Sequence, residues 1–356
     1  MLREVWPFVD DCRRTGLPVA LARLIGRDGP GARPLGATMA VAQDGTWRGS
    51  LSGGCVEGIV LDAARDVLAG APPAVIPVSP GGHLLPWEET PSCAGELRVL
   101  IAAAPADPIH SRITTALAED RRLFVRVALR PPYPWSVSAE LHQLPQCDPA
   151  FTEILAGRSK LLLIGATDLA AIIATLAGSL GRDVVVLDPR PGHVASGDSF
   201  GGATVVRSWA DEWIARHPLG PRDAVVALSH DPRIDDRALR AALSGPAGYV
   251  AALGSRATHT QRLRRLAEVP GVHRISGPAG LDLGGGDLAD TALAILAELV
   301  AVENGRGGQR LREGELPIRV VGPVPGVRGW PGPERGADGG ESPRGPSFDG
   351  VDAGRR

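Results

Sequence analysis

The stretch that decides the fold is residues 161–170, which read LLLIGATDLA. A short apolar run at 161–164 is followed by a glycine turn at Gly165 and then by a helical pattern over 169–180. Continuous apolar runs of this length suit strands that are buried on both faces of a parallel sheet. The stretch therefore predicts the first strand, turn and helix of a Rossmann-like domain.

The same alternation of strand and helix continues towards residue 304. Four more short apolar runs are predicted strands, at 184–187, 204–206, 224–228 and 249–253. Helical patterns lie between them at 211–217, 235–243 and 259–268, and a last helix begins after Asp287, a good N-cap residue. Strands that alternate with helices in this way are typical of a doubly wound parallel sheet.

The first half of the chain has a different pattern, mixed α/β with hairpin pairing. Asp44-Gly45 supplies the positive backbone angles of a tight hairpin between predicted strands at 39–42 and 46–51. Further strands are predicted at 19–25, 97–103 and 124–129, and helices at 4–14, 56–68 and 109–119.

These patterns predict an α/β chain with two domains. An N-terminal mixed α/β domain covers residues 1–130, and a Rossmann-like doubly wound parallel-sheet domain covers 159–304. Residues 131–158 are predicted as a linker, because the part up to 149 holds five prolines and shows no periodicity. Residues 305–356 hold 14 glycines and 7 prolines in 52 positions, which is typical of a disordered tail.

Charge and cysteine content exclude several classes of protein. The 356 residues include 38 Lys+Arg and 40 Asp+Glu, and a net charge of −2 gives no electrostatic footprint for DNA or RNA. Four cysteines without a CxxC pair are neither a disulfide framework nor a typical structural zinc site. No signal-peptide or membrane-span pattern is visible. We expect a cytoplasmic protein with no nucleic-acid or membrane partner.

The turn after the first Rossmann strand departs from a dinucleotide-binding fingerprint. Thr167 stands where the fingerprint has a glycine, and Asp168 is expected to cap the helix N–H groups that a phosphate would use. In favour of a dinucleotide, Asp188 ends the second strand about where an acid would hold a ribose. One feature supports NAD(P) and two oppose it, so NAD(P) binding is not expected.

Three other turns lie at the predicted carboxyl edge of the sheet, where ligands of such folds bind. Ser229-His230-Asp231 could transfer protons, or simply cap the next helix. Gly254-Ser255-Arg256 could grip a phosphate, or serve as an N-cap beside a surface arginine. Asp282 could reach the same crevice or close its own turn.

Residues 50–58, which read SLSGGCVEG, are the most informative segment of the first half. Gly53 and Gly54 remove side-chain bulk immediately before Cys55, whose place at a helix start lowers a thiol pKa and exposes the sulfur. The alternative is a packing cysteine. Cys93 lies in a second turn of small residues. Two such thiols without metal spacing suit a soft ligand or sulfur chemistry better than zinc.

The sequence resembles the XdhC/CoxI family of xanthine dehydrogenase accessory proteins over most of residues 1–304. The segments that carry the resemblance are 49–58, 93–97, 229–231, 249–256 and 277–284. Two departures from the family pattern are visible. Thr167 and Asp168 replace a glycine and a histidine of the Rossmann turn, and Ala94 replaces a glycine after Cys93.

The resemblance implies a cofactor-maturation factor without catalysis of its own. Members of the family bind the molybdenum cofactor, in its molybdopterin form, as cargo while a cysteine desulfurase installs a terminal sulfur. They then promote its insertion into the large subunit of a xanthine dehydrogenase-type molybdenum hydroxylase. A homodimer would suit a carrier that serves paired subunits. With Cys55 as the molybdenum contact, the cofactor-binding candidates are Ser52, Gly53, Gly54, Cys55, Glu57, Cys93, Gly165, Asp188, Ser229, His230, Gly254, Ser255, Arg256 and Asp282.

Two other functions compete with this hypothesis. The Rossmann-like pattern and Asp188 would suit a nicotinamide-dependent oxidoreductase, although fold by itself is weak support for that chemistry. The chain could also be a scaffold that binds no small molecule and only docks a desulfurase or a hydroxylase subunit.

Overall fold

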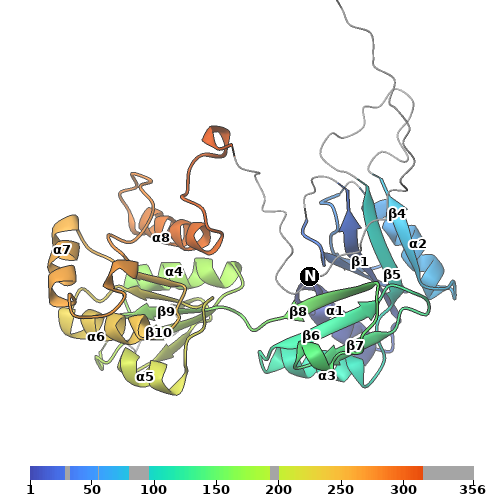
Figure 1. The fold of residues 1–356 in the computed structure, drawn as a ribbon, viewed down its shortest axis with the longest axis horizontal. Helices are drawn as coiled ribbons and strands as arrows, with labels where there is room; N and C mark the ends of the chain where they lie inside the picture. The colour runs from blue at the N-terminus through green and yellow to red at the C-terminus, as the bar shows by residue number, and fades with distance from the viewer. Residues whose placement is uncertain (29–32, 55, 80–95, 193–199, 316–356) are drawn as a thin grey trace, which may run out of the picture. The chain divides into compact units, whose positions relative to one another are not determined.

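The computed structural model describes residues 1–28, 33–54, 56–79, 96–192 and 200–315. They form two units (Figure 1). Among the described residues, unit 1 holds Met1–Ala116 and Leu123–Leu155, and unit 2 holds Leu117–Arg122 and residues 156–315. Most of the predicted disordered tail, residues 316–356, lies outside the described residues. Within the described residues, no helix is long and apolar enough to cross a membrane.

Unit 2 is built on a parallel sheet of six strands in the order β11-β10-β9-β12-β13-β14. The chain leaves β9 in one direction and later returns beside it as β12, so the strand order reverses between these two strands. This is the doubly wound topology that the sequence predicts. The strands are β9 (Lys160–Ile164), β10 (Asp183–Leu187), β11 (Thr204–Val206), β12 (Ala224–Ala227), β13 (Tyr249–Ala252) and β14 (Ile275–Ser276).

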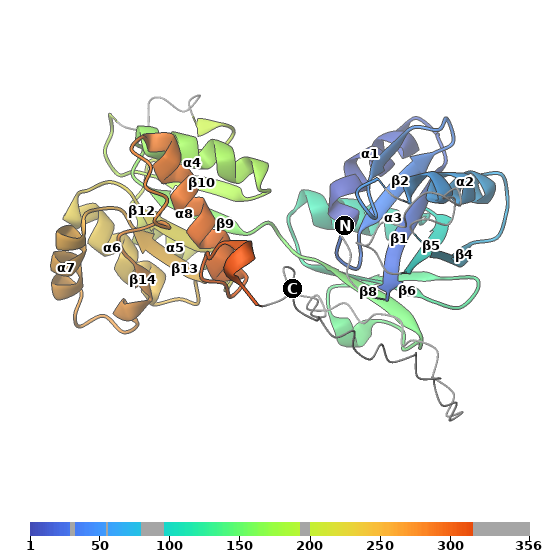
Figure 2. The ribbon, with the colours of Figure 1, turned by 90° about the horizontal axis from the view of Figure 1, so that it is seen from above.

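Helices cover both faces of this sheet (Figures 1 and 2). Leu162 and Ile164 of β9 belong to the core beneath α5 and α6, whereas Leu161 and Leu163 belong to the core beneath α4 and α8. Since both faces are buried, the strand needs an unbroken apolar run. Asp287 caps α8 as expected. The helices are α4 (Asp168–Ser179), α5 (Ala210–Arg216), α6 (Pro232–Leu243), α7 (Arg256–Arg265) and α8 (Leu288–Glu303).

Unit 1 contains a five-stranded antiparallel sheet in the order β3-β2-β1-β5-β4. The predicted hairpin at Asp44-Gly45 joins β2 and β3, and Gly45 has a φ of +86°. Strand β4 is not predicted from the sequence, because it is a half-buried edge strand that contains Pro77. The elements are α1 (Leu2–Arg14), β1 (Val19–Arg27), β2 (Thr38–Ala42), β3 (Trp47–Gly49), α2 (Glu57–Leu68), β4 (Ala74–Val78) and β5 (Leu97–Ala103).

Most of the segment predicted as a linker, residues 131–155 of 131–158, is instead part of unit 1. Strands β7 (Trp135–Ser138) and β8 (Ala150–Leu155) pair antiparallel with β6 (Leu123–Ala128), which follows α3 (Ile109–Ala118). Unit 1 therefore extends to Leu155 and does not end at residue 130. The prolines occupy the connections around the short strand β7, so residues 131–149 show no periodicity.

A buried ion pair joins the two sheets of unit 1. Arg23 of β1 and Glu153 of β8 are 0% and 1% exposed, and the carboxylate also accepts a hydrogen bond from the Leu2 backbone N–H at 3.2 Å. The guanidinium lies over the rings of Trp135 and Phe151, at 5.2 and 5.0 Å from their centroids. Burial raises the pKa of Glu153 and lowers that of Arg23, so each charge depends on the other.

Glu153→Ala should strongly destabilise unit 1, because it leaves the Arg23 charge buried without a partner. We expect the free energy of unfolding to fall by about 3–5 kcal/mol. Urea unfolding followed by tryptophan fluorescence measures the change. The control is the double variant Arg23→Leu/Glu153→Leu, which removes both charges and should recover most of the loss. If the single and double variants are equally destabilised, the loss in the free energy of unfolding comes from packing volume and not from the unpaired charge.

Candidate functional site

In unit 1, the carboxylate of Glu57 organises the glycine-rich loop that precedes α2. Glu57 is the first residue of α2 and is 6% exposed. Its Oε1 accepts hydrogen bonds from Ser50 Oγ (2.7 Å) and from the N–H groups of Leu51 (3.1 Å), Ser52 (3.0 Å) and Gly53 (3.2 Å). Its Oε2 accepts from Ser52 Oγ (2.7 Å) and from the N–H groups of Gly54 (2.9 Å) and Val56 (3.1 Å).

These bonds decide the charge of the loop. Burial by itself would raise the pKa of Glu57, but the hydrogen bonds from Ser50, Ser52 and the Leu51 N–H outweigh it and hold this pKa far below its ordinary value. The carboxylate is therefore ionised, and both of its oxygens accept several hydrogen bonds from the loop. The backbone donors that could have bound an external anion are occupied by the protein's own acid.

The two glycines of this loop are exposed and open to solvent. Gly53 and Gly54 have φ of +94° and +128°, and, apart from their chain neighbours, no atom of the described residues lies within 4 Å of where a Cβ would stand. Glycine is thus required for the left-handed backbone, and no neighbour restricts the space beside it. Cys55 and Cys93 lie outside the described residues. The residues on either side of Cys55, however, both donate to Glu57.

In unit 2, Gly165 and Ser229 bring together the turns that follow the neighbouring strands β9 and β12. A Cβ on Gly165, whose φ is +107°, would lie 2.8 Å from Ser229 Cα. Only glycine fits this approach. The turn is also fixed by Asp188, which follows β10 and accepts a hydrogen bond from the Ala166 N–H at 2.9 Å.

Asp188 is completely buried and fully bonded. Its Oδ1 accepts from the backbone N–H and the Nε of Arg190, both at 2.9 Å, and its Oδ2 accepts from Arg190 Nη2 at 2.7 Å. Burial would raise the pKa of Asp188, but the bonds from Arg190 and Ala166 lower it. With its oxygens taken by Arg190 and the turn, this carboxylate is not presented to a ribose.

The helix cap at this turn differs from the prediction. Thr167, not Asp168, is the N-cap of α4, and its Oγ1 accepts from the Ala170 N–H at 3.2 Å. Thr167 has the extended backbone that an N-cap residue needs, whereas Asp168 is already helical.

The segment Ser229-His230-Asp231 combines a cap with a buried acid. Asp231 caps α6 by accepting from the Arg233 N–H at 2.9 Å, and bonds from Arg233 lower the pKa of Asp231 to about 2. Ser229 Oγ donates to the buried Asp235 at 2.6 Å. Burial raises the pKa of Asp235, although Ser229 opposes it. His230 is exposed with a left-handed φ of +60°, a strained conformation often found at functional sites.

The segment Gly254-Ser255-Arg256 is a helix cap that leaves its arginine available. Ser255 Oγ accepts from the Thr258 N–H at 3.1 Å and lies 2.9 Å from Thr258 Oγ1. Arg256 is exposed, and its guanidinium makes no hydrogen bond or ion pair with the residues that the structure describes. A ligand could therefore use it without competition.

Asp282 does not close its own turn. The turn is held by Glu298, whose Oε2 accepts from the Gly280 N–H at 2.7 Å and from the Tyr249 hydroxyl at 2.5 Å. Asp282 is exposed and has no hydrogen-bond partner in the described part of the chain.

Several residues that shape the unit 2 edge were missed by the sequence analysis. Arg262 of α7 is buried, donates to the Leu253 carbonyl oxygen at 2.9 Å and lies 4.0 Å from Asp235. Arg190 follows Asp188 by two residues, and this short spacing could have indicated the ion pair from the sequence. Asp235, Arg262 and Glu298 lie inside helices, where no spacing in the sequence reveals their partners.

The predicted site residues thus fall into two groups, one in each unit. Contacts connect Gly165, Asp188 and Ser229, and Asp235 and Arg262 link Ser229 to the Gly254 turn. Arg256 and Asp282 are exposed, and their side chains have no hydrogen bond or ion pair with another residue in the described part of the chain. In unit 1, hydrogen bonds connect Ser52, Gly53, Gly54 and Glu57.

Comparison with known protein families gives two matches. Residues 161–299 match the family described as the XdhC Rossmann domain, and residues 12–77 match the XdhC and CoxI family. The first range contains the motifs at 229–231, 249–256 and 277–284, and the second contains the glycine-rich segment at 49–58. The turn at 93–97 lies outside both.

Two curated proteins and a solved structure illustrate the similarity of the chain to known proteins. The molybdenum cofactor insertion chaperone PaoD of Escherichia coli is 26% identical, over 84% of this chain and 88% of its own length. A Bacillus subtilis protein described as a probable subunit of xanthine dehydrogenase is 25% identical, over 79% and 92%. A Bacillus halodurans crystal structure described as a xanthine dehydrogenase has a TM-score of 0.72 at 22% identity, over 85% and 96%, and shows the same fold.

Glu57→Gln should loosen the loop before α2, because an amide cannot accept all the bonds that the carboxylate accepts. We expect a loss of about 1–3 kcal/mol in the free energy of unfolding and faster amide exchange at residues 51–54. Asp62→Asn is the matched control, since Asp62 lies on the same helix with a side chain 77% exposed.

The destabilisation should also depend on pH. The pKa of Glu57 is lowered in the folded state, so its contribution is present above the unfolded pKa of about 4.3 and is lost as the pH falls. The difference between the wild type and Glu57→Gln should therefore shrink in acid. A difference that is independent of pH would contradict this assignment.

Proposed function

Because the chain belongs to the XdhC and CoxI family, we propose that it is a molybdenum cofactor insertion chaperone for an enzyme of the xanthine dehydrogenase type. The observation that carries the proposal is the exposed Gly53-Gly54 turn, which Glu57 holds immediately before Cys55. Similarity to a molybdenum cofactor insertion chaperone over most of the chain supports it.

In this proposal, Cys55 binds the molybdenum of the cargo through its sulfur. Thiolates are the ligands that soft, sulfur-rich centres prefer, and Cys93 offers a second thiol. Gly53 and Gly54 present no side chain, so a bulky ligand can approach the backbone closely. Since Glu57 takes the loop N–H groups, the loop offers few donors to a phosphate and is better suited to the metal end of the cofactor.

Unit 2 offers a separate candidate site for a phosphate group of a ligand. Arg256 has an uncommitted guanidinium at the start of α7, directly after the Ser255 cap. A cation at a helix N-terminus suits a phosphate ester, because the helix dipole and the guanidinium both attract negative charge. His230 and Asp282, both exposed, are the remaining side chains that could contact the cargo.

We further propose that the carrier acts between two protein partners. A cysteine desulfurase would supply the terminal sulfur while the cofactor is held, and the large subunit of a molybdenum hydroxylase would receive it. A homodimer would serve the paired subunits of such a client.

The observations favour the two rival functions less. For a nicotinamide-dependent oxidoreductase, Asp188 would have to present its carboxylate to a ribose, but Arg190 and the Ala166 N–H already occupy it. For a scaffold without a ligand, the open glycine loop and the uncommitted Arg256 would have no use.

Co-expression with active cofactor synthesis, followed by anaerobic purification and molybdenum analysis, tests the proposal. We expect the wild type to retain molybdenum and pterin and Cys55→Ser to lose most of both, because the variant lacks the soft ligand. Cys147→Ser, which alters an exposed free thiol, should retain them. Absence of molybdenum and pterin from the wild type would refute the chaperone function, and tight NADH binding would favour the oxidoreductase.

A further inference from the structure

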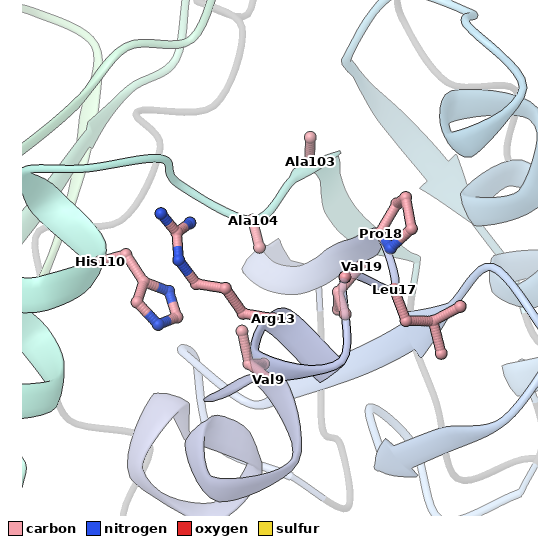
Figure 3. A pocket seen from close by; sticks show the side chains of 9 residues that line it. Val9, Arg13, Leu17, Pro18, Val19, Ala103, Ala104 and His110 are labelled. Carbon is pink, nitrogen blue, oxygen red and sulfur yellow. The ribbon is translucent and has the colours of Figure 1, made fainter. Parts of the chain in front are cut away.

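Unit 1 contains a pocket that the proposed function does not use (Figure 3). It has a volume of about 300 Å³ and lies where α1 ends, β1 begins, β5 ends and α3 begins. This volume is at the small end of the range for ligand pockets. The lining residues are Val9, Arg13, Gly16, Leu17, Pro18, Val19, Ala103, Ala104 and His110.

His110 is fixed in this pocket with one ring nitrogen unused. Its side chain is 5% exposed, and its Nε2 bonds to Asp10 Oδ1 at 3.0 Å. Asp10 also accepts from Thr114 Oγ1 at 3.2 Å, and Thr114 in turn accepts from the indole N–H of Trp6 at 2.9 Å. The Trp6 ring packs against the imidazole, with centroids 5.0 Å apart.

The other ring nitrogen of His110, Nδ1, makes no hydrogen bond with any residue that the structure describes. Because an ionised carboxylate only accepts hydrogen bonds, Nε2 carries the proton that Asp10 accepts. The imidazole is thus held in one orientation, with Nδ1 left for another partner. This arrangement of carboxylate, imidazole and free nitrogen is typical of a histidine that contacts a ligand.

Arg13 extends toward His110 in the same pocket (Figure 3). Its side chain is 42% exposed, and its Nη2 donates to Asp107 Oδ2 at 2.5 Å. Asp107 is also held by Ser111, so it anchors the guanidinium from one side. Among the described residues, the Arg13–Asp107 pair uses one N–H group of the guanidinium. The remaining N–H groups of the guanidinium can donate to an oxyanion.

The rest of the lining is apolar. Val9, Leu17, Pro18 and Val19 come from α1, the following turn and β1. A ligand that fills the pocket therefore has a charged group at the Arg13 end and a short apolar body against these side chains. We propose that this pocket binds a small organic oxyanion, with its acidic group on the Arg13 guanidinium and its apolar body beside the His110 ring.

This site is independent of the proposed chaperone function. None of its lining residues belongs to the loop of residues 50–58 or to unit 2. Loss of molybdenum binding would leave it unaffected, and loss of oxyanion binding would leave the molybdenum test unaffected.

NMR titration of the full-length protein, labelled with ¹⁵N at histidine, tests the proposal with butyrate and, separately, inorganic phosphate as probes. His110→Gln assigns the His110 ring signals. We expect butyrate to shift these signals saturably, and phosphate to bind more weakly because it lacks the apolar body. Arg13→Gln should weaken butyrate binding about tenfold or more, the size of a charged hydrogen bond.

Arg14→Gln is the matched control. It removes the same charge from the neighbouring position of α1, where the side chain is 70% exposed and pairs with Asp11, and should leave butyrate binding unchanged. Arg13→Lys keeps the positive charge but lacks the paired N–H donors of the guanidinium, and should give an intermediate affinity for butyrate. The proposal fails if neither probe shifts the His110 signals, if only phosphate does, or if Arg13→Gln binds butyrate as the wild type does.

Discussion

An internal carboxylate beneath each glycine-rich turn is the constraint on which both candidate sites depend. Backbone N–H groups must be satisfied, and a glycine turn gathers several of them in one place. In unit 1 the carboxylate of Glu57 satisfies those before α2, and in unit 2 that of Asp188 satisfies the Ala166 N–H after β9. In both turns an acid of the protein itself therefore takes backbone N–H groups that an external anion could have used.

This constraint changes what the turns can recognise. A phosphate-binding loop offers its backbone N–H groups to the ligand, whereas most of the N–H groups of the loop before α2 are bonded to Glu57. The turn before Cys55 is left open and electrostatically satisfied, which suits a thiolate contact with a soft metal centre. Asp188 is paired with Arg190, so its carboxylate is not available to accept a hydrogen bond from a ribose hydroxyl.

The sequence by itself determined the architecture of unit 2 and much of unit 1. The apolar runs of β9, β10, β12 and β13 are a local property, because a strand buried on both faces has to be apolar throughout. The Asp287 cap and the Asp44-Gly45 hairpin are local for the same reason, since a few neighbouring residues decide them. The motifs at 49–58 and 229–284 also sufficed to indicate the family.

Only the tertiary structure decided which polar groups meet. Arg23 and Glu153 are far apart in the chain, yet they pair in the core and draw 135–155 into unit 1 in place of a linker. From its position in the sequence, Asp188 could have bound a ribose, but its carboxylate accepts hydrogen bonds from Arg190 and from the Ala166 N–H of the turn after β9. His110 depends on Asp10 and Trp6 from another helix. Periodicity reports burial, whereas the partner of a buried charge is chosen by long-range packing, which no local pattern encodes.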